Sequence, residues 1–323
     1  MYKAFYNLKR NPFEITPDPS FLFPTKRHNE ALAAVYYGVR WCKGFVVLTG
    51  PVGTGKTLLL RCLLQFLKQS KDIAYAYLFN SRLSPTEFLQ YIVADFGLPV
   101  SGKNKCELLF DLCQYVVTRG LNHLTTVLIV DEAHHLSTEA LEEVRLLTNL
   151  ETAQRKLLQI VLVGQPELDD KLDSLKLTQL KQRIAVRSHL EPLDFEETRG
   201  YIERRLQLAG ADSRAETLFP PNTIEAVYRH SQGIPRLINT ICENALISAY
   251  AKQIQSITPT IVDDVAEGFR LNVVHPGEVE RLSALDEMDV QRAARILLDL
   301  YASLRKRSEN VELLTPVASQ FRQ

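Results

Sequence analysis

The stretch Gly50-Pro-Val-Gly-Thr-Gly-Lys-Thr57 decides the fold predicted for this 323-residue chain. It matches the pattern G-x-x-x-x-G-K-[ST], directly follows the apolar run Phe45–Thr49, and opens the amphipathic segment Thr57–Lys68. Glycines let backbone N–H groups surround phosphate oxygens, and the first turn of a helix adds partial positive charge. This order of strand, loop and helix predicts a phosphate-binding loop. The residues expected to contact a nucleotide are Gly50, Pro51, Val52, Gly53, Thr54, Gly55, Lys56, Thr57 and Leu58.

An acidic pair follows a second apolar run, Val127-Leu-Ile-Val-Asp-Glu132. Four apolar residues predict a buried strand, with Asp131 at its carboxyl end beside the phosphate loop. In such a site Lys56 reaches the β- and γ-phosphates, Thr57 and Asp131 ligate Mg²⁺, and Glu132 orients or deprotonates the attacking water. The pattern therefore predicts an ATPase with ATP and Mg²⁺ as its cofactors.

Three more polar side chains are candidates for this site. Gln165 follows the apolar strand Leu158–Val163, so it is expected at the same sheet edge, holding the attacking water or sensing the γ-phosphate; the alternative is a plain turn residue. Arg236 opens a later helix and is expected to reach the nucleotide when that region closes, unless it is only a solvated side chain. Arg183 precedes the last strand and is positioned to enter a neighbouring subunit's site. Arg187 competes for that role, and a surface salt bridge is the remaining alternative.

The segment Asp131-Glu-Ala-His134 also spells the box of DEAH helicases. A helicase of that kind needs a second α/β core, whereas the chain after Pro192 has a helical pattern, so this alternative is disfavoured. The adjacent His134 and His135 are candidate metal ligands. Neighbouring residues at the end of a strand usually point apart. We therefore expect His134 and His135 to be loop or interface residues that do not bind a metal.

Short apolar strands alternate with longer amphipathic helices from Phe45 onward, which predicts an α/β fold with a five-stranded parallel sheet covered by helices on both faces. The last strand is expected near Val186–Leu190. After Pro192 four helical segments predict a small all-α lid. The expected domains are residues 1–192 for the nucleotide-binding domain with an N-terminal segment, 193–275 for the lid, and 276–323 for a C-terminal amphipathic helix, Val279–Leu304, and tail.

The composition is that of an ordinary globular protein. Lys plus Arg and Asp plus Glu each number 38, and 46% of the residues are hydrophobic, which excludes a disordered chain and a globally basic nucleic-acid binder. No run approaches the roughly 20 apolar residues needed to span a bilayer. Five cysteines without a C-x-x-C pair favour buried, reduced thiols. A cytoplasmic protein is expected, peripheral to the inner membrane only through a partner.

Taken together, the motifs resemble those of AAA+ ATPases, and more narrowly the general secretion pathway protein A family, over roughly residues 1–270. They are Asn11-Pro-Phe13, Pro17-Asp-Pro19, the phosphate loop, Asp131-Glu-Ala-His134, Val163-Gly-Gln-Pro-Glu-Leu168, Gln182-Arg-Ile184 and Gly233-Ile-Pro-Arg236. The resemblance implies that Gln165 is sensor 1, Arg183 the trans arginine finger and Arg236 sensor 2. It also implies that Pro12 and Phe13 line the adenine pocket.

The resemblance further implies a homo-oligomer, a ring or a helical assembly, with ATP between subunits. Well-known family members continue into a membrane span and a peptidoglycan-binding domain. Neither is expected here, so the chain is more similar to cytoplasmic ATPases found with pilus, exopolysaccharide or protein-sorting loci. The leading hypothesis is therefore an ATP-hydrolysing switch or assembly motor with a protein partner in a bacterial secretion or envelope system.

Two other functions compete with this one. An ATP-dependent, DNA-binding transposition regulator is the runner-up, but the basic residues are scattered without a block or a recognisable reader motif, so DNA is the less favoured partner. The third is a scaffold role for the helix Val279–Leu304, which either packs on its own lid or binds a partner or another subunit.

Overall fold

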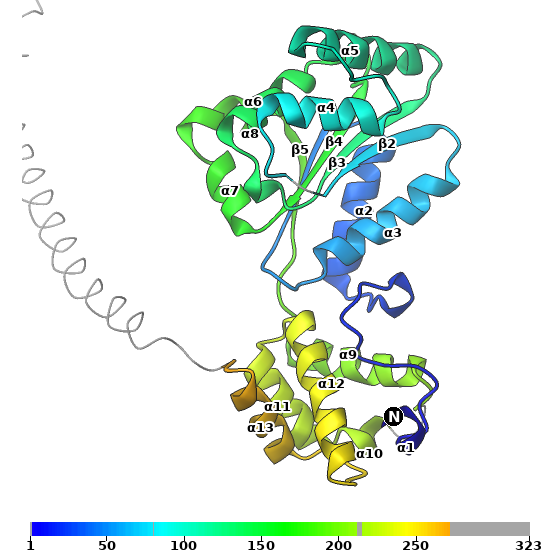
Figure 1. Ribbon diagram of the computed structural model, residues 1–323, viewed down its shortest axis with the longest axis vertical. Coiled ribbons are helices and arrows are strands. Elements are labelled where there is room, and N and C mark those ends of the chain that lie inside the picture. Colours follow the sequence, from blue (N-terminus) through cyan, green and yellow to red (C-terminus); the bar gives the residue numbers. More distant parts are fainter. Residues whose placement is uncertain (1, 80, 212–214, 272–323) are drawn as a thin grey trace, which may run out of the picture. The chain divides into compact units, whose positions relative to one another are not determined.

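The computed structural model describes residues 2–79, 81–211 and 215–271. Within them, five parallel strands form one sheet in the order β2-β3-β4-β1-β5, which confirms the predicted fold class (Figure 1). The strands are β1 Phe45–Thr49, β2 Ile73–Leu78, β3 Thr125–Val130, β4 Leu158–Gly164 and β5 Ile184–His189. The edge strand β5 begins two residues before the expected position, since its alternating burial gives a weaker apolar signal than that of the fully buried strands.

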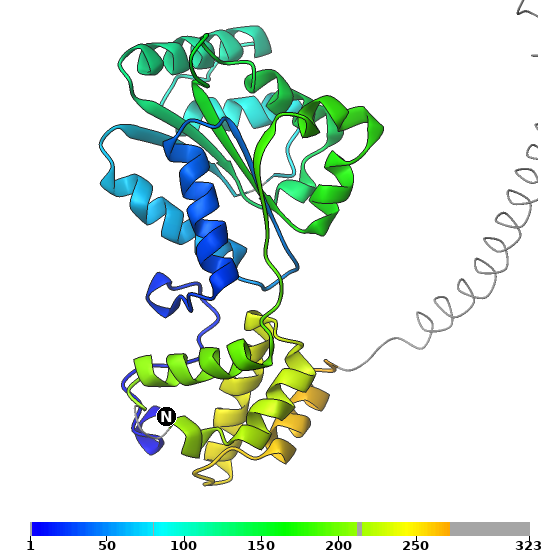
Figure 2. The ribbon, with the colours of Figure 1, turned by 180° about the vertical axis from the view of Figure 1, so that it is seen from behind.

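Helices cover both faces of the sheet, and each face has its own apolar core. Figure 2 shows α2 (Lys26–Arg40) and α3 (Lys56–Gln69) on one face, where they pack on inward residues such as Val46 and Ile129. The other face packs on alternate residues such as Val47 and Leu128. Its helices are α4 Pro85–Asp95, α5 Lys105–Leu121, α6 Thr138–Leu147, α7 Pro166–Leu172 and α8 Thr178–Lys181. The period of two along buried strands produces these two cores.

A helical domain, here called the lid, follows the sheet. Its helices are α9 Phe195–Leu208, α10 Ala215–Leu218, α11 Pro221–Ser231, α12 Pro235–Ala251 and α13 Pro259–Gly268. Asp194 and Glu197 form a capping box at the start of α9, and proline occupies the first turn of α11, α12 and α13. These local signals explain why the helix boundaries lie close to those predicted from the sequence.

The N-terminal residues contribute to the core of the lid, although the sequence grouped them with the α/β domain. The short helix α1 (Tyr2–Phe5) and the buried side chains of Tyr6 and Phe13 belong to the same apolar cluster as α9–α13. The Tyr2 hydroxyl donates to the Glu243 carboxylate at 2.8 Å, and the Tyr6 hydroxyl donates to the carbonyl of Ile254 at 2.9 Å. The chain then returns through the 3₁₀ helix η1 (Pro19–Phe21) to α2.

The remaining expectations concern the C-terminal segment and the thiols. Residues Met1–Leu271 form one compact unit, and the predicted helix Val279–Leu304 lies outside the described residues. All five cysteines are free, and only Cys62 and Cys242 are buried. Among the helices of the described ranges, none has the length and apolar character required to cross a membrane.

Candidate functional site

The phosphate loop connects β1 to α3 at the carboxyl edge of the sheet. Gly53 and Gly55 have positive φ angles of 82° and 100°, a region in which side chains with a Cβ are strained. A Cβ on Gly53 would also lie 2.9 Å from the Cβ of Arg236, because the start of α12 packs against the loop. The backbone N–H of Arg236 donates to the Gly53 carbonyl at 3.3 Å. The lid is therefore in direct contact with the loop.

Lys56 is buried inside this loop, at 6% exposure. Its Nζ donates to the carbonyls of Gly50 at 2.7 Å and Pro51 at 2.8 Å. Burial lowers the pKa of Lys56, and the carboxylates of Glu132 and Asp131 oppose this shift. The ammonium group is thus held at the centre of the loop by carbonyl oxygens and two nearby acids.

Asp131 lies at the end of β3 and is almost fully buried. Its Oδ2 accepts from the Thr57 hydroxyl at 3.3 Å and from the Tyr77 hydroxyl at 3.0 Å, while Oδ1 accepts from the backbone N–H of Glu132 at 2.9 Å. Burial raises the pKa of Asp131, and the hydrogen bonds from Tyr77 and Glu132 oppose that rise. The hydroxyl of Thr57 and the carboxylate of Asp131 are hard oxygen ligands in contact with each other, so this pair fits Mg²⁺.

Glu132 follows directly, in the left-handed conformation with φ 52°. This conformation is uncommon for a residue with a side chain, and non-glycine residues in it concentrate at functional sites. The Ser81 hydroxyl donates to the Glu132 carbonyl at 2.6 Å and so fixes the backbone. The carboxylate contacts the side-chain amide of Gln165 at 3.4 Å, which brings the two predicted water-orienting residues together.

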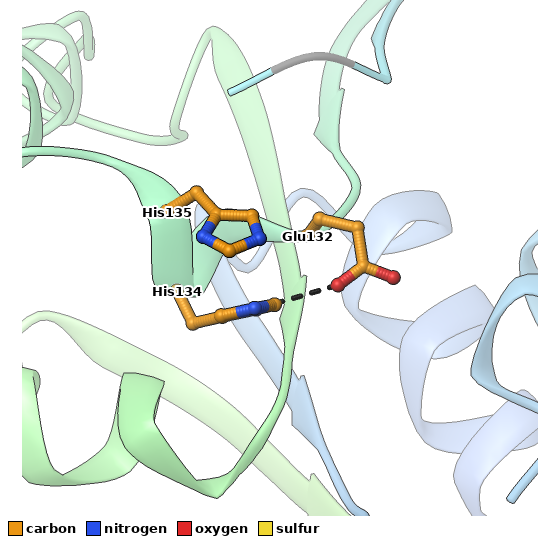
Figure 3. Close-up of side chains that lie close together, drawn as sticks. All are labelled: Glu132, His134 and His135. Carbon is orange, nitrogen blue, oxygen red and sulfur yellow. Dashed lines mark ion pairs between the residues drawn. The ribbon is translucent and has the colours of Figure 1, made fainter. Parts of the chain in front are cut away.

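The two histidines after Glu132 point to the same side, which corrects the expectation that they point apart. They lie on the 3₁₀ helix η2 (Ala133–His135) rather than on an extended strand, and their ring centroids are 4.0 Å apart. Figure 3 shows the Glu132 carboxylate directed at the His134 ring, with 3.4 Å between Oε2 and Nδ1. Burial and the adjacent His135 lower the pKa of His134, which favours the neutral imidazole. Side-chain ligand atoms of Glu132, His134 and His135 lie within 4.8 Å of one another, so this group has the composition of a metal site.

A cavity of about 400 Å³ lies between the loop and the lid, and Glu132 is part of its lining. Its volume is within the usual range of small-molecule sites. Predicted residues in its lining are Val52, Gly53, Gly55, Lys56, Thr57, Leu58, Glu132, Gln165 and Arg236. Residues that the sequence did not assign to the site also line it, namely Glu14, Ile15, Thr16, Pro17, Asp18, Phe21, Tyr201, Arg205, Pro235 and Asn239.

Pro12 and Phe13 do not line this cavity, contrary to what the resemblance implied. Both are buried, and the Phe13 ring packs edge-on against Phe219 of the lid, with 5.7 Å between ring centroids. The next residues, Glu14–Asp18, line the cavity instead. An apolar aromatic side chain is stabilised more in the lid core than at a half-open cavity wall, which accounts for the shift.

Arg183 and Arg187 lie outside the cavity lining. Arg183 precedes β5 and donates to the Arg145 carbonyl at 3.2 Å and the Thr148 hydroxyl at 2.6 Å. Arg187, within β5, donates from Nε to Asp169 at 3.0 Å. Neither guanidinium therefore acts on the cavity of its own chain in this arrangement.

Arg205 is the most unusual of the lining residues that the sequence did not single out. It is 4% exposed, and its Nη1 donates to the Tyr201 hydroxyl at 3.0 Å and to Asn239 Oδ1 at 2.8 Å. Its guanidinium lies 4.6 Å from the centroid of the Phe21 ring, a cation–π contact. The sequence did not identify it because two of its partners, Phe21 and Asn239, are distant along the chain.

The loop is also anchored from outside by His28, which the sequence analysis did not assign to the site. Its Nε2 contacts the Thr54 carbonyl at 3.0 Å and its Nδ1 contacts the hydroxyl of Thr25, the N-cap of α2, at 2.7 Å. Burial lowers the pKa of His28. A buried imidazole thus connects α2 to the phosphate loop.

The chain is similar to known proteins in both sequence and structure. Residues 42–172 match the AAA domain family. General secretion pathway protein A of Aeromonas hydrophila is 46% identical over 253 residues, which cover 78% of this chain and 45% of that protein. This chain thus aligns with less than half of its relative's length.

Two solved structures share the fold at low sequence identity. The Aeropyrum pernix ORC2 protein in ADPNP–ADP complexes has a TM-score of 0.59 at 20% identity, covering 80% of this chain and 71% of that one. The CDC6P protein of Pyrobaculum aerophilum has a TM-score of 0.60 at 17% identity, covering 82% and 70%. The identity to this relative confirms the resemblance: the chain belongs to the AAA+ family of general secretion pathway protein A.

Proposed function

We propose that this chain hydrolyses ATP in a Mg²⁺-dependent reaction at the cavity between the phosphate loop and the lid. The observation that carries the proposal is the convergence of Lys56, Thr57, Glu132, Gln165 and Arg236 on that one cavity. They come from four separate stretches of the sequence, and their chemical types are those that phosphoryl transfer requires.

Each of these residues has a distinct task in the proposed reaction. Lys56 and the backbone N–H groups of the loop neutralise the phosphates, and Arg236 adds positive charge from the lid. Thr57 and Asp131 hold Mg²⁺, which supplies further neutralisation of the developing charge when bound. Binding at this cavity thereby engages both the sheet and the lid.

Glu132 and Gln165 act on the water rather than on the phosphates. The carboxylate of Glu132 accepts a proton from the water or orients it, and the Gln165 amide, 3.4 Å from that carboxylate, holds the water in line. Of the acidic pair after β3, Asp131 is engaged by Thr57 and Tyr77, so Glu132 is the member available for this role.

Two substitutions test the catalytic proposal. Lys56→Ala is expected to lower kcat/KM at least about 100-fold, and Glu132→Gln is expected to lower kcat similarly while ATP still binds. Phosphate release and binding of a fluorescent ATP analogue measure the two effects. Lys68→Ala, on the exposed side of the same helix α3, is the matched control. Wild-type turnover in either active-site variant would refute the proposal.

Oligomerisation belongs to the same proposal, with Arg183 reaching the cavity of a neighbouring subunit. Its position outside its own cavity supports a role in trans. In the wild type, ATPase activity per subunit is expected to rise with protein concentration. Arg183→Ala is expected to lose this increase, while its affinity for ATP stays unchanged. Arg187→Ala is the comparison variant and is expected to keep this increase. If Arg187→Ala loses the increase and Arg183→Ala keeps it, the role in trans belongs to Arg187. Equal loss of affinity and turnover would contradict a role in trans.

We further propose that the ATPase serves a bacterial secretion or envelope system. The support is the 46% identity to general secretion pathway protein A. Replacing the chain in its own host with the Glu132→Gln variant is expected to block export or assembly by that system. Normal export in the presence of only this variant would separate the chain from secretion without affecting the ATPase assignment.

A further inference from the structure

We propose that His134 is a positioning residue that fixes the Glu132 carboxylate and the Gln165 amide relative to each other. The inference rests on the proposed ATP hydrolysis and adds a third residue to it. The two water-orienting groups follow the neighbouring strands β3 and β4, and the ring of His134 lies against both of them.

The imidazole of His134 contacts both of these residues. Its Nδ1 accepts from the backbone N–H of Gln165 at 3.3 Å, and its Nε2 lies 3.0 Å from the side-chain amide nitrogen of Gln165. Glu132 Oε2 lies 3.4 Å from the same Nδ1, so the neutral ring limits the position of the carboxylate by contact and not by a hydrogen bond. One ring therefore touches the main chain and side chain of Gln165 and the carboxylate of Glu132.

The backbone around His134 is held closely enough to make the ring a fixed support. Lys171 Nζ, on α7, donates to the carbonyls of His134 and of Leu136, the latter at 3.0 Å. A Cβ on Gly164 would lie 3.2 Å from the backbone nitrogen of His134, so the end of β4 passes directly beside η2. A glycine at this point lets strand and turn approach.

The neighbouring His135 provides an internal contrast. His134 is 8% exposed, whereas His135 is exposed to solvent. Of the two rings, only that of His134 lies within hydrogen-bonding distance of Gln165, and its Nδ1 accepts from the Gln165 N–H. Since both nitrogens of His134 already face Gln165, the geometry favours positioning over metal ligation.

This arrangement links sensing to catalysis. Because the ring is a fixed support, it keeps the Gln165 amide and the Glu132 carboxylate at one separation when Gln165 contacts a γ-phosphate. Misplacement of such groups by about 1 Å costs about 100-fold in rate. Loss of His134 should therefore slow the chemical step and leave ATP binding intact.

Steady-state ATPase assays on the full chain test the inference, with binding of a fluorescent ATP analogue measured in parallel. His134→Ala is expected to lower kcat about 10- to 100-fold with KM changed less than about twofold. His135→Ala, the matched control, should stay within about twofold of the wild type. His134→Asn keeps an acceptor near the position of Nδ1 and should recover part of the loss. In a Gln165→Ala background, His134→Ala should add no more than about twofold, since the two residues act as a unit.

Several results would overturn the inference. The first is an equal kcat for His134→Ala and His135→Ala. The second is a raised KM with unchanged kcat in His134→Ala. The third is a loss in kcat for His134→Ala that multiplies with the loss for Gln165→Ala in the double variant. Equal losses in both histidine variants, together with a wild-type activity that responds to Zn²⁺ or to a zinc-selective chelator at saturating Mg²⁺, would instead identify a metal site. If a thermal melt shows that His134→Ala does not fold, the kcat values of His134→Asn and His135→Ala are compared instead. A kcat of His134→Asn that is no lower than that of His135→Ala overturns the inference. A wild type that binds ATP without hydrolysing it refutes the proposed function and this inference with it, whereas the other results leave that function standing.

Discussion

Tyr77→Phe tests whether the placement of Asp131 depends on a neighbouring strand. The Tyr77 hydroxyl, on β2, donates to Asp131 Oδ2 at 3.0 Å, and the acid is only 5% exposed. The substitution removes one oxygen atom and leaves the ring in place. The expected result is a less stable protein, because a buried carboxylate loses a donor.

The magnitude follows from the remaining contacts of Asp131. A hydrogen bond to a charged group contributes about 1.5–3 kcal/mol. The carboxylate keeps the Thr57 hydroxyl at 3.3 Å and the Glu132 N–H at 2.9 Å, so it is not left unpartnered. We therefore expect the lower part of that range, about 1.5–2 kcal/mol, which corresponds to a melting temperature lowered by about 3–8 °C.

Thermal unfolding of the full chain measures this effect. Tyr75→Phe is the matched control, since Tyr75 lies on the same strand and its hydroxyl has no hydrogen bond within the described residues. Its expected change is below about 0.5 kcal/mol. A double-mutant cycle with Asp131→Asn should give a coupling free energy of at least about 0.5 kcal/mol. The reasoning fails if Tyr77→Phe and Tyr75→Phe melt together, or if the cycle shows no coupling.

Two further predictions concern backbone strain and pH. Gly233→Ala places a Cβ 1.8 Å from the Leu193 carbonyl oxygen at a φ of 72°. It should lower the free energy of unfolding, measured by thermal unfolding, by at least about 2 kcal/mol. Gly268→Ala is the control, because the space around Gly268 is open, and it should not destabilise the fold. Burial lowers the pKa of His28 below 6.5, so its neutral form stabilises the fold fully above about pH 6.5, and that stability is lost as pH falls through the lower folded pKa. Melting curves between about pH 5 and 8 should show this decline in the wild type and a weaker one in His28→Asn; identical curves would contradict it.

The centre of the site was predictable because its signals are local. The phosphate loop and the acidic end of β3 carry fixed residue types at fixed spacing, each next to a strand that is buried along its whole length. In a parallel sheet the carboxyl ends of the strands meet at one edge, so these motifs were expected to converge. Gln165 followed from the same reasoning, and it contacts Glu132.

The rest of the site depends on neighbours that are distant along the chain. Tyr77 reads as one more residue of a strand, and only the pairing of β2 with β3 brings it to Asp131. The displacement of Phe13 into the lid required knowledge of Phe219, more than half the chain away. The clustering of His134 with His135 depended on a 3₁₀ turn in place of an extended exit from β3.

The closure of the lid core by the first residues of the chain sets an order of events during synthesis. Tyr2 and its partner Glu243 are separated by 241 residues. At about 5–20 residues per second, a ribosome needs about 12–48 s to add that length. For that time the aromatic residues of α1 exist without α12, the helix that carries their partners Glu243 and Tyr250. The sheet can form earlier on the nascent chain, whereas the lid core, and with it the wall of the cavity made by residues 14–18, must wait for α12.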